Sequence, residues 1–356
     1  MNGAELLAGR RICVCVGAGG VGKTTTAAAL ALGMAARGLK VAVVTIDPAR
    51  RLGDALGVDQ LDNEPRPVDA ERLAGIEMRG QLWAMMLDPK RTFDDLIDRV
   101  APTPERAAEI KRNGVYRELS SAVSGSQEFT AIEKLYELAE ADYDLLVLDT
   151  PPAHNAAEFL NAPGRLTALL ESGALQALQR PSGIGMRLLG LGAAPLLAAL
   201  KLVTGVDLVS DLAAFFTLLG GMTEEFNARA ARVQQLLHAP ETAFVLVTSA
   251  QDRPILEAIR FRETLRESRM PFVGAIVNRV TQPLPRGEVA LDLPPDLAAA
   301  VASCAADHRV LAERDAANIE RLRDAFAGEP ILRVPDLSDD IHDVEGLLAI
   351  HRELFR

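Results

Sequence analysis

The chain has 356 residues, a formal net charge of −11 and 49% hydrophobic residues. This length suffices for a large buried core, as two domains or as one α/β domain with an insertion. The negative charge argues against a general attraction to nucleic acid or anionic lipid, so we expect no nucleic-acid partner. Three cysteines, Cys13, Cys15 and Cys304, are too few for a disulfide framework or a zinc site of the CxxC kind.

Neither a signal peptide nor a membrane span is expected. The N-terminal residues MNGAELLAGRR lack the apolar run of a signal peptide. The longest apolar stretch, residues 188–200, is shorter than the ~20 residues that a transmembrane helix needs. We therefore expect a cytoplasmic protein without a transmembrane segment, whose association with a membrane, where it occurs, is peripheral and made through a partner.

The chain begins with an alternation of strands and helices. ICVCV at 12–16 predicts a buried strand that ends in glycines, and TTTAAALALGMAARG at 24–38 predicts a helix. The next strand is predicted at 40–47, which completes a βαβ unit. Further short apolar strands are predicted at 82–88, 142–149, 242–249 and 271–278, with helices at 127–141 and 253–268. The pattern is typical of an α/β fold with a doubly wound, mostly parallel sheet.

Nearly a hundred residues without a convincing strand interrupt this alternation. We expect residues 1–160 and 240–356 to form the α/β core, and 161–239 to form an inserted α-helical subdomain. A smaller helical insertion is expected at about 90–125. The apolar segment 184–221 has two interpretations that stay open: a groove for an apolar client, or a helical bundle that packs on the sheet.

Residues 17–24, GAGGVGKT, match G-x-x-x-x-G-K-[ST] between a predicted strand and a predicted helix. The glycines allow backbone N–H groups to face phosphate oxygens, and the helix N-terminus adds its partial positive charge. Lys23 would reach the β- and γ-phosphates, and the Thr24 hydroxyl would bind Mg²⁺. The residues expected at the phosphates are Gly19, Gly20, Val21, Gly22, Lys23, Thr24 and Thr25.

Polar residues end several of the other strands, and such residues converge at one edge of a parallel sheet. Asp47 can orient or deprotonate the attacking water, or hold the metal. Asp149 follows four apolar residues, a pattern that presents a carboxylate to Mg²⁺. Thr24, Asp47 and Asp149 are thus the predicted metal site. Asn278 ends the last clear strand, and its carboxamide suits an adenine edge, although strand-end asparagines usually serve turns.

The segments GAGGVGKTTTAAALA, TIDPARRLGDALG, LDTPP, IVN and VPDLSDDIHDVEGL resemble the arsenite-pump ATPase family, which includes the ATPases that target tail-anchored membrane proteins. The resemblance implies a P-loop ATPase that uses ATP and Mg²⁺, works as a dimer and binds a hydrophobic client through the inserted helices. It also implies that Lys23 and Asp47 are catalytic, that Asp149 is the acid of the second switch, and that Asn278 and the loop around Pro335 contact adenine.

The chain departs from the family pattern in ways that change what we expect. Ala18 stands where the family loop usually has a second lysine, which reaches across the dimer, so we expect slow hydrolysis in isolation. Arg50 or Arg51 could supply the charge, or the two arginines could be a solvated pair. A related subunit could also carry the lysine, in a heterodimer. Because trivalent arsenic prefers thiolates, direct arsenite transport is not expected. A positioning or assembly ATPase of the Par/Min kind is the alternative function.

Overall fold

The computed structural model describes residues 1–47, 51–73, 75–114, 116–117, 126–150, 218, 222–284, 294–337 and 343–356. Its contacts divide the chain into two compact units. The first comprises Met1–Leu87, Leu138–Ala156 and His238–Arg356, and the second comprises Asp88–Glu137 and Ala157–Leu237. Each unit is described by itself, and the domain boundaries expected from the sequence stay predictions.

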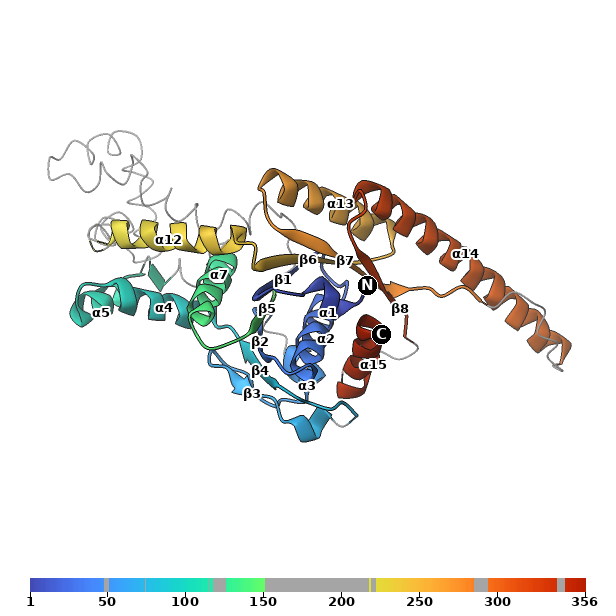
Figure 1. Ribbon diagram of the computed structural model, residues 1–356, viewed down its shortest axis with the longest axis horizontal. Coiled ribbons are helices and arrows are strands. Elements are labelled where there is room, and N and C mark those ends of the chain that lie inside the picture. The colour runs from blue at the N-terminus through green and yellow to red at the C-terminus, as the bar shows by residue number, and fades with distance from the viewer. Residues whose placement is uncertain are drawn as a thin grey trace, which may run out of the picture. The chain divides into compact units, whose positions relative to one another are not determined.

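The first unit is built on one sheet with the strand order β3-β4-β2-β5-β1-β6-β7-β8 (Figure 1). The strands are β1 (Ile12–Val16), β2 (Lys40–Thr45), β3 (Arg66–Pro67), β4 (Gln81–Met86), β5 (Leu145–Asp149), β6 (Thr242–Ser249), β7 (Phe272–Val280) and β8 (Ile331–Pro335). All neighbouring pairs are parallel except β3 and β4. The predicted fold class, an α/β fold with a mostly parallel sheet, is confirmed.

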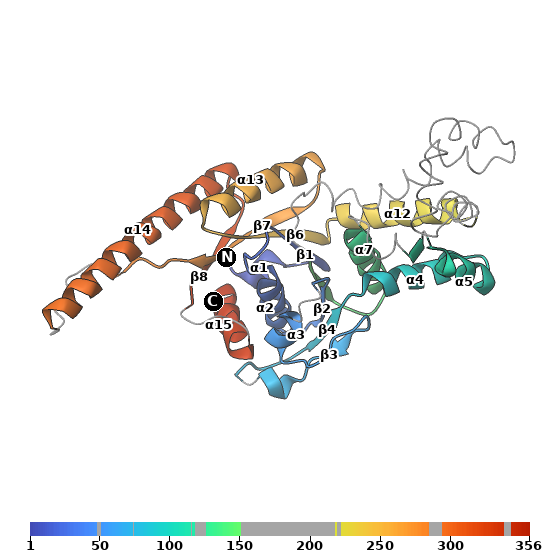
Figure 2. The ribbon, with the colours of Figure 1, turned by 180° about the vertical axis from the view of Figure 1, so that it is seen from behind.

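Helices cover both faces of this sheet. In Figure 1, α1 (Gly3–Leu6), α2 (Lys23–Ala36), α3 (Arg51–Leu56) and α15 (Val344–Phe355) lie on one side, while α13 (Asp252–Glu267) and α14 (Pro295–Ala325) lie on the other. Figure 2 shows the same division from behind. Because both faces are covered, every residue of β1, β5 and β6 is buried, as is typical of parallel sheets.

The candidate site lies at the carboxyl end of the central strands. β1 lies between β5 and β6, and the chain passes from β1 to α2 through residues 17–22. Helix α2 is buried on nearly all sides, which its Ala- and Leu-rich sequence permits. Cys13 and Cys15 are fully buried on β1 and belong to the hydrophobic core. Since strand order diverges at β1, ligands of such a sheet bind at the carboxyl end of this strand.

Several elements of the first unit were not predicted. Strands β3 and β8 are short, contain proline and occupy the two edges of the sheet. Pro335, which the sequence placed in a loop, is the last residue of β8. The short 3₁₀ helix η1 spans Ala70–Leu73. The 31-residue helix α14 was also unassigned by the sequence analysis, and its first half is largely exposed.

The described part of the second unit is helical. It contains α4 (Pro89–Val100) and α5 (Pro104–Arg112), and most of α7 (Ser126–Ala139) and α12 (Thr223–His238). Helix α4 begins where the sequence dictates, because the Asp88 side chain accepts a hydrogen bond from the Arg91 N–H and Pro89 occupies the first turn. The apolar segment 184–221, interpreted either as a client groove or as a bundle packed on the sheet, lies almost entirely outside the described residues.

Candidate active site

The loop between β1 and α2 has the backbone geometry of a phosphate-binding loop. Gly17 has φ 149° and Gly22, the N-cap of α2, has φ 90°. A side chain at Gly17 would place its Cβ 2.0 Å from the carbonyl oxygen of Val247 on β6. Only glycine fits at this position. Without a side chain, the backbone at Gly17 can pass close to β6 and lead from β1 into α2. The first N–H groups of α2 have no partner within the helix and are therefore available to a ligand. This helix end favours an anion such as phosphate.

Lys23, the first residue of α2, contacts this loop. Its Nζ donates a hydrogen bond to the carbonyl oxygen of Ala18, with N and O 2.8 Å apart, and only 7% of the residue is exposed. Burial lowers the pKa of Lys23 below its usual value, while Asp149, Cys15 and Asp47 act in the opposite direction. Ala18 stands where the family usually has a second lysine. In this chain it contacts Lys23 only through its backbone carbonyl oxygen.

Asp149 ends β5 beside the loop and is 1% exposed. Its Oδ2 accepts two hydrogen bonds, from Thr24 Oγ1 at 2.7 Å and from Thr45 Oγ1 at 2.8 Å. Its Oδ1 is buried and has no hydrogen-bond partner in the part of the chain that the structure describes. Burial raises the pKa of Asp149, and the bonds from Thr24 and Thr45 oppose that rise.

Thr45 was missed by the sequence analysis. It ends β2, and the pairing of β2 with β5 places it directly beside Asp149. The sequence feature that could have identified Thr45 is its hydroxyl, two positions before Asp47, the predicted catalytic acid. Thr45 also receives a hydrogen bond from the Asp47 N–H, with N and O 3.2 Å apart.

Asp47 follows β2 and is partly exposed. Its Oδ2 lies 3.9 Å from Nε of Arg51, the first residue of α3, whose side chain is 67% exposed. An exposed pair of this kind contributes little stability, so Arg51 is poorly restrained by Asp47. The other candidate cation, Arg50, lies outside the described residues, and the role of either arginine stays a prediction.

Asn278 also lies at the loop, but it contacts protein backbone there. Its Nδ2 donates to the carbonyl oxygen of Val21, with N and O 3.0 Å apart, and the residue is 4% exposed. Pro335 lines a cavity of about 1080 Å³ with residues that include Thr281, Arg309 and Arg333. Adenine contacts by Asn278 and Pro335 stay predictions.

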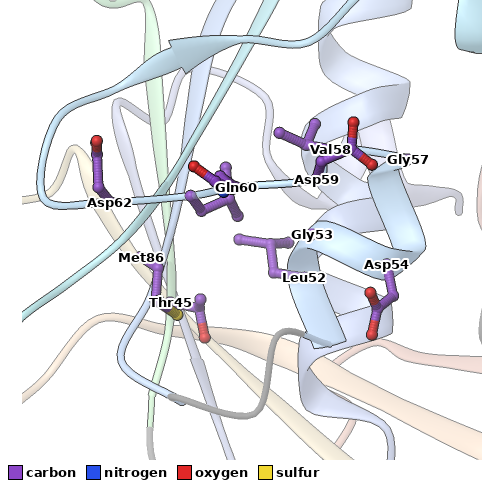
Figure 3. A pocket seen from close by; sticks show the side chains of 11 residues that line it. Thr45, Leu52, Gly53, Asp54, Gly57, Val58, Asp59, Gln60, Asp62 and Met86 are labelled. Carbon is purple, nitrogen blue, oxygen red and sulfur yellow. The ribbon is translucent and has the colours of Figure 1, made fainter.

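A second cavity of about 890 Å³ opens where β2 and β4 end. Figure 3 shows Thr45 and Met86, paired residues of these strands, on one side of it, and Asp54 and Asp59 of the α3 region on another. Leu52 of α3 also lines it. The end of β2 therefore contacts Asp149 on one side and borders this cavity on the other.

The donor set fits Mg²⁺. The Thr24 hydroxyl, the Asp149 carboxylate and the Asp47 carboxylate are hard oxygen ligands, which this ion prefers. Oδ1 of Asp149 has no hydrogen-bond partner among the described residues, and an ion or its bound water would satisfy this buried acceptor. The three predicted metal residues thus gather at one end of the sheet, with Thr24 and Asp149 already in direct contact.

A family profile described as "Anion-transporting ATPase" matches residues 10–355. The chain belongs to this family. The resemblance expected from the sequence is confirmed, and the expected enzyme class, an ATPase, is that of the family. In the described part of the chain, none of the helices of this family member is long and apolar enough to cross a membrane.

Similar proteins are also named as ATPases. "ATPase get3" of Schizosaccharomyces japonicus is 26% identical over 320 residues, which cover 89% of this chain and 84% of the relative. "ATPase get3" of Schizosaccharomyces pombe is 24% identical over 329 residues, covering 92% and 85%. "ATPase BagA" of Mycobacterium tuberculosis is 27% identical over 281 residues, covering 77% and 66%. The chain thus spans just under two thirds of the mycobacterial relative's length.

Proposed function

We propose that the chain binds ATP with Mg²⁺ at residues 19–25 and hydrolyses it. One observation carries this proposal: Asp149, buried beside the N-terminus of α2, accepts a hydrogen bond from Thr24 and keeps a second oxygen unpaired among the described residues. An unpaired oxygen on a buried carboxylate costs free energy unless a ligand such as a metal ion or its bound water interacts with it. A loop that favours phosphate and an acid that favours a cation meet at this point.

The residues of the site would share the work. Lys23 would move its Nζ from the Ala18 carbonyl oxygen to the phosphates, and backbone N–H groups of the loop would orient them. Mg²⁺, when bound by Thr24 and by Asp149 or Asp47, would offset the negative charge of the phosphate oxygens. Asp47, which is partly exposed at the end of β2, would orient the attacking water.

Mutation of single site residues tests this proposal. Lys23→Ala should abolish binding of a fluorescent ATP analogue, because the loop loses its only side-chain cation. Asp47→Asn should retain binding but reduce single-turnover hydrolysis by about 10²- to 10⁴-fold, the usual contribution of a positioned acid or base. Wild-type affinity in the Lys23 variant would contradict the assignment of the site.

We further propose that hydrolysis drives rearrangement of a dimer that binds a hydrophobic protein segment. The support is the resemblance to the targeting ATPases. Sedimentation with and without a nonhydrolysable ATP analogue should show nucleotide-dependent association, and a monomer under both conditions would contradict it. Capture from the native cell should recover proteins with hydrophobic tails. Recovery of assembly or positioning partners instead would favour the Par/Min-like alternative.

Ala18 favours a second candidate, one subunit of a heteromeric ATPase. The residue is packed against the core and supplies no charge, so a related subunit could contribute the missing lysine. Mixing the chain with such a subunit should then raise the hydrolysis rate far above the sum of the separate rates. For the homodimer, Arg51→Ala should slow single-turnover hydrolysis if Arg51 supplies the charge, and should leave it unchanged if the arginines are only solvated.

A further inference from the structure

Thr45 is hydrogen-bonded to both strand-end acids, Asp149 and Asp47. Its Oγ1 donates to Asp149 Oδ2 at 2.8 Å and accepts from the Asp47 N–H at 3.2 Å. A threonine hydroxyl has a single hydrogen and two lone pairs, so one hydroxyl can make both bonds at once. The residue is nearly fully buried, at 2% exposed.

The position of Thr45 in the sheet makes this link direct. β2 and β5 are neighbours, and Thr45 is the register partner of Asp149. Asp47 follows Thr45 by two residues, where the chain leaves the sheet. The hydroxyl therefore joins the backbone of Asp47 to the carboxylate of Asp149 across one strand pair.

The strand conformation at position 45 does not depend on this hydroxyl. Valine has the same shape as threonine and suits a buried strand at least as well. Asp149 Oδ2 has two hydroxyl donors, Thr24 and Thr45. Under the proposed function, Thr24 binds Mg²⁺ through a lone pair of its hydroxyl oxygen, so Thr45 is the donor to Asp149 Oδ2 that does not also bind the ion.

We propose that Thr45 is a positioning residue for ATP hydrolysis, which holds the Asp149 carboxylate for Mg²⁺ and keeps Asp47 in register with it. The inference rests on the proposed function. It adds a specific role to a residue that touches neither the nucleotide nor the attacking water: through Thr45, a change at the Mg²⁺ site reaches the backbone of the acid that orients water.

Two variants of Thr45 and one matched control test the role. Thr45→Val removes the hydroxyl at constant shape, and Thr45→Ser keeps the hydroxyl. Thr26→Val is the control, because Thr26 is also fully buried but its Oγ1 has no hydrogen-bond partner among the described residues. The measurements are the affinity for a fluorescent ATP analogue without Mg²⁺, the Mg²⁺ concentration at half-maximal nucleotide binding, and the single-turnover rate.

We expect Thr45→Val to bind the analogue without Mg²⁺ within about twofold of wild type, since the loop is intact. Its Mg²⁺ requirement should rise and its single-turnover rate should fall by about 10- to 100-fold, the effect of losing one hydrogen bond to a charged group. Thr45→Ser should recover most of both losses, and Thr26→Val should match wild type. If Thr45 had only a structural role, Thr45→Val would lower the free energy of unfolding, but it would not slow turnover while leaving Mg²⁺-free nucleotide binding unchanged.

Wild-type Mg²⁺ dependence and rate in Thr45→Val would overturn the inference, and so would a Thr45→Ser variant as defective as Thr45→Val. If Thr45→Val does not fold, Thr45→Ala carries the same expectations. The two proposals fail differently. Loss of the site assignment would appear as equal ATP binding by wild type and Lys23→Ala, whereas the Thr45 role fails with ATP binding and the Lys23 effect intact.

Discussion

Asn278 and Gly22 are in contact at the base of the phosphate loop. A methyl group on Gly22 would lie 2.2 Å from Nδ2 of Asn278, the same atom that donates to the Val21 carbonyl oxygen. Gly22 also has φ 90°, which disfavours any other residue. The last strand of the predicted series thus supports the shape of the loop that follows the first strand.

We predict that Gly22→Ala reduces affinity for ATP by more than tenfold. The new methyl group would displace the Asn278 amide and break its bond to Val21, and it would add the strain of a positive φ, about 1–2 kcal/mol. Titration with a fluorescent ATP analogue measures the affinity, and urea unfolding measures the stability.

Gly38→Ala separates the two effects. Gly38 has φ 105°, but a Cβ there would have no neighbour within 4 Å. This variant should show the cost of the strained backbone alone and bind ATP as wild type does. If both variants lose the same stability and retain ATP affinity, the contact with Asn278 does not shape the loop.

The second unit contains a buried ion pair whose disruption should be costly. Glu133 on α7 is 3% exposed and accepts a hydrogen bond from Nε of Arg229 on α12. Burial raises the pKa of Glu133, and Arg229 opposes that rise. We predict that Arg229→Met lowers the free energy of unfolding by about 3–5 kcal/mol, because it leaves a buried carboxylate without its partner. Urea unfolding measures the change.

Two further variants make this prediction specific. Glu133→Gln combined with Arg229→Met should recover most of the lost stability, since no buried charge then remains. Arg99→Met breaks a more exposed pair with Glu137, whose N and O atoms are 2.8 Å apart, and should cost no more than about 1 kcal/mol. Equal costs for the two single arginine variants would contradict the role assigned to burial.

His351 should make stability depend on pH. It lies on α15, its ring stacks on Phe355 at 5.0 Å between centroids, and neither ring nitrogen has a hydrogen-bond partner in the described ranges. Burial lowers the pKa of His351 below 6.5, and the nearby Arg37 and Arg352 act in the same direction. The folded protein therefore binds this proton less readily than the unfolded chain.

The stabilising contribution of neutral His351 is thus fully present above pH 6.5 and is lost as pH falls below it, towards the lower pKa of the folded state. His351→Phe keeps a ring and removes the titration. We predict that the variant gains stability relative to wild type between about pH 6.5 and 5, while the difference is constant above pH 7.5. Urea midpoints measured over this range test it, and parallel curves would contradict it.

The fold was largely accessible from sequence because its signals are local. Six of the eight strands are apolar runs that the periodicity predicts, and the glycines and Lys23 lie between a strand and a helix as the motif requires. β3 and β8 carry no such signal. They are short, partly exposed edge strands with proline, so their pairing partner rather than their composition makes them strands.

The same distinction applies to the site. Sequence alone determined the phosphate loop, the two strand-end acids and the family, because each depends on residue types in a short segment. The part played by Thr45 was decided only by the tertiary structure. Its hydroxyl matters because β2 pairs with β5 in a register that sets it against Asp149, 104 residues away. Hydrogen bonds act over about 3 Å in space, and spacing along the chain does not report that distance.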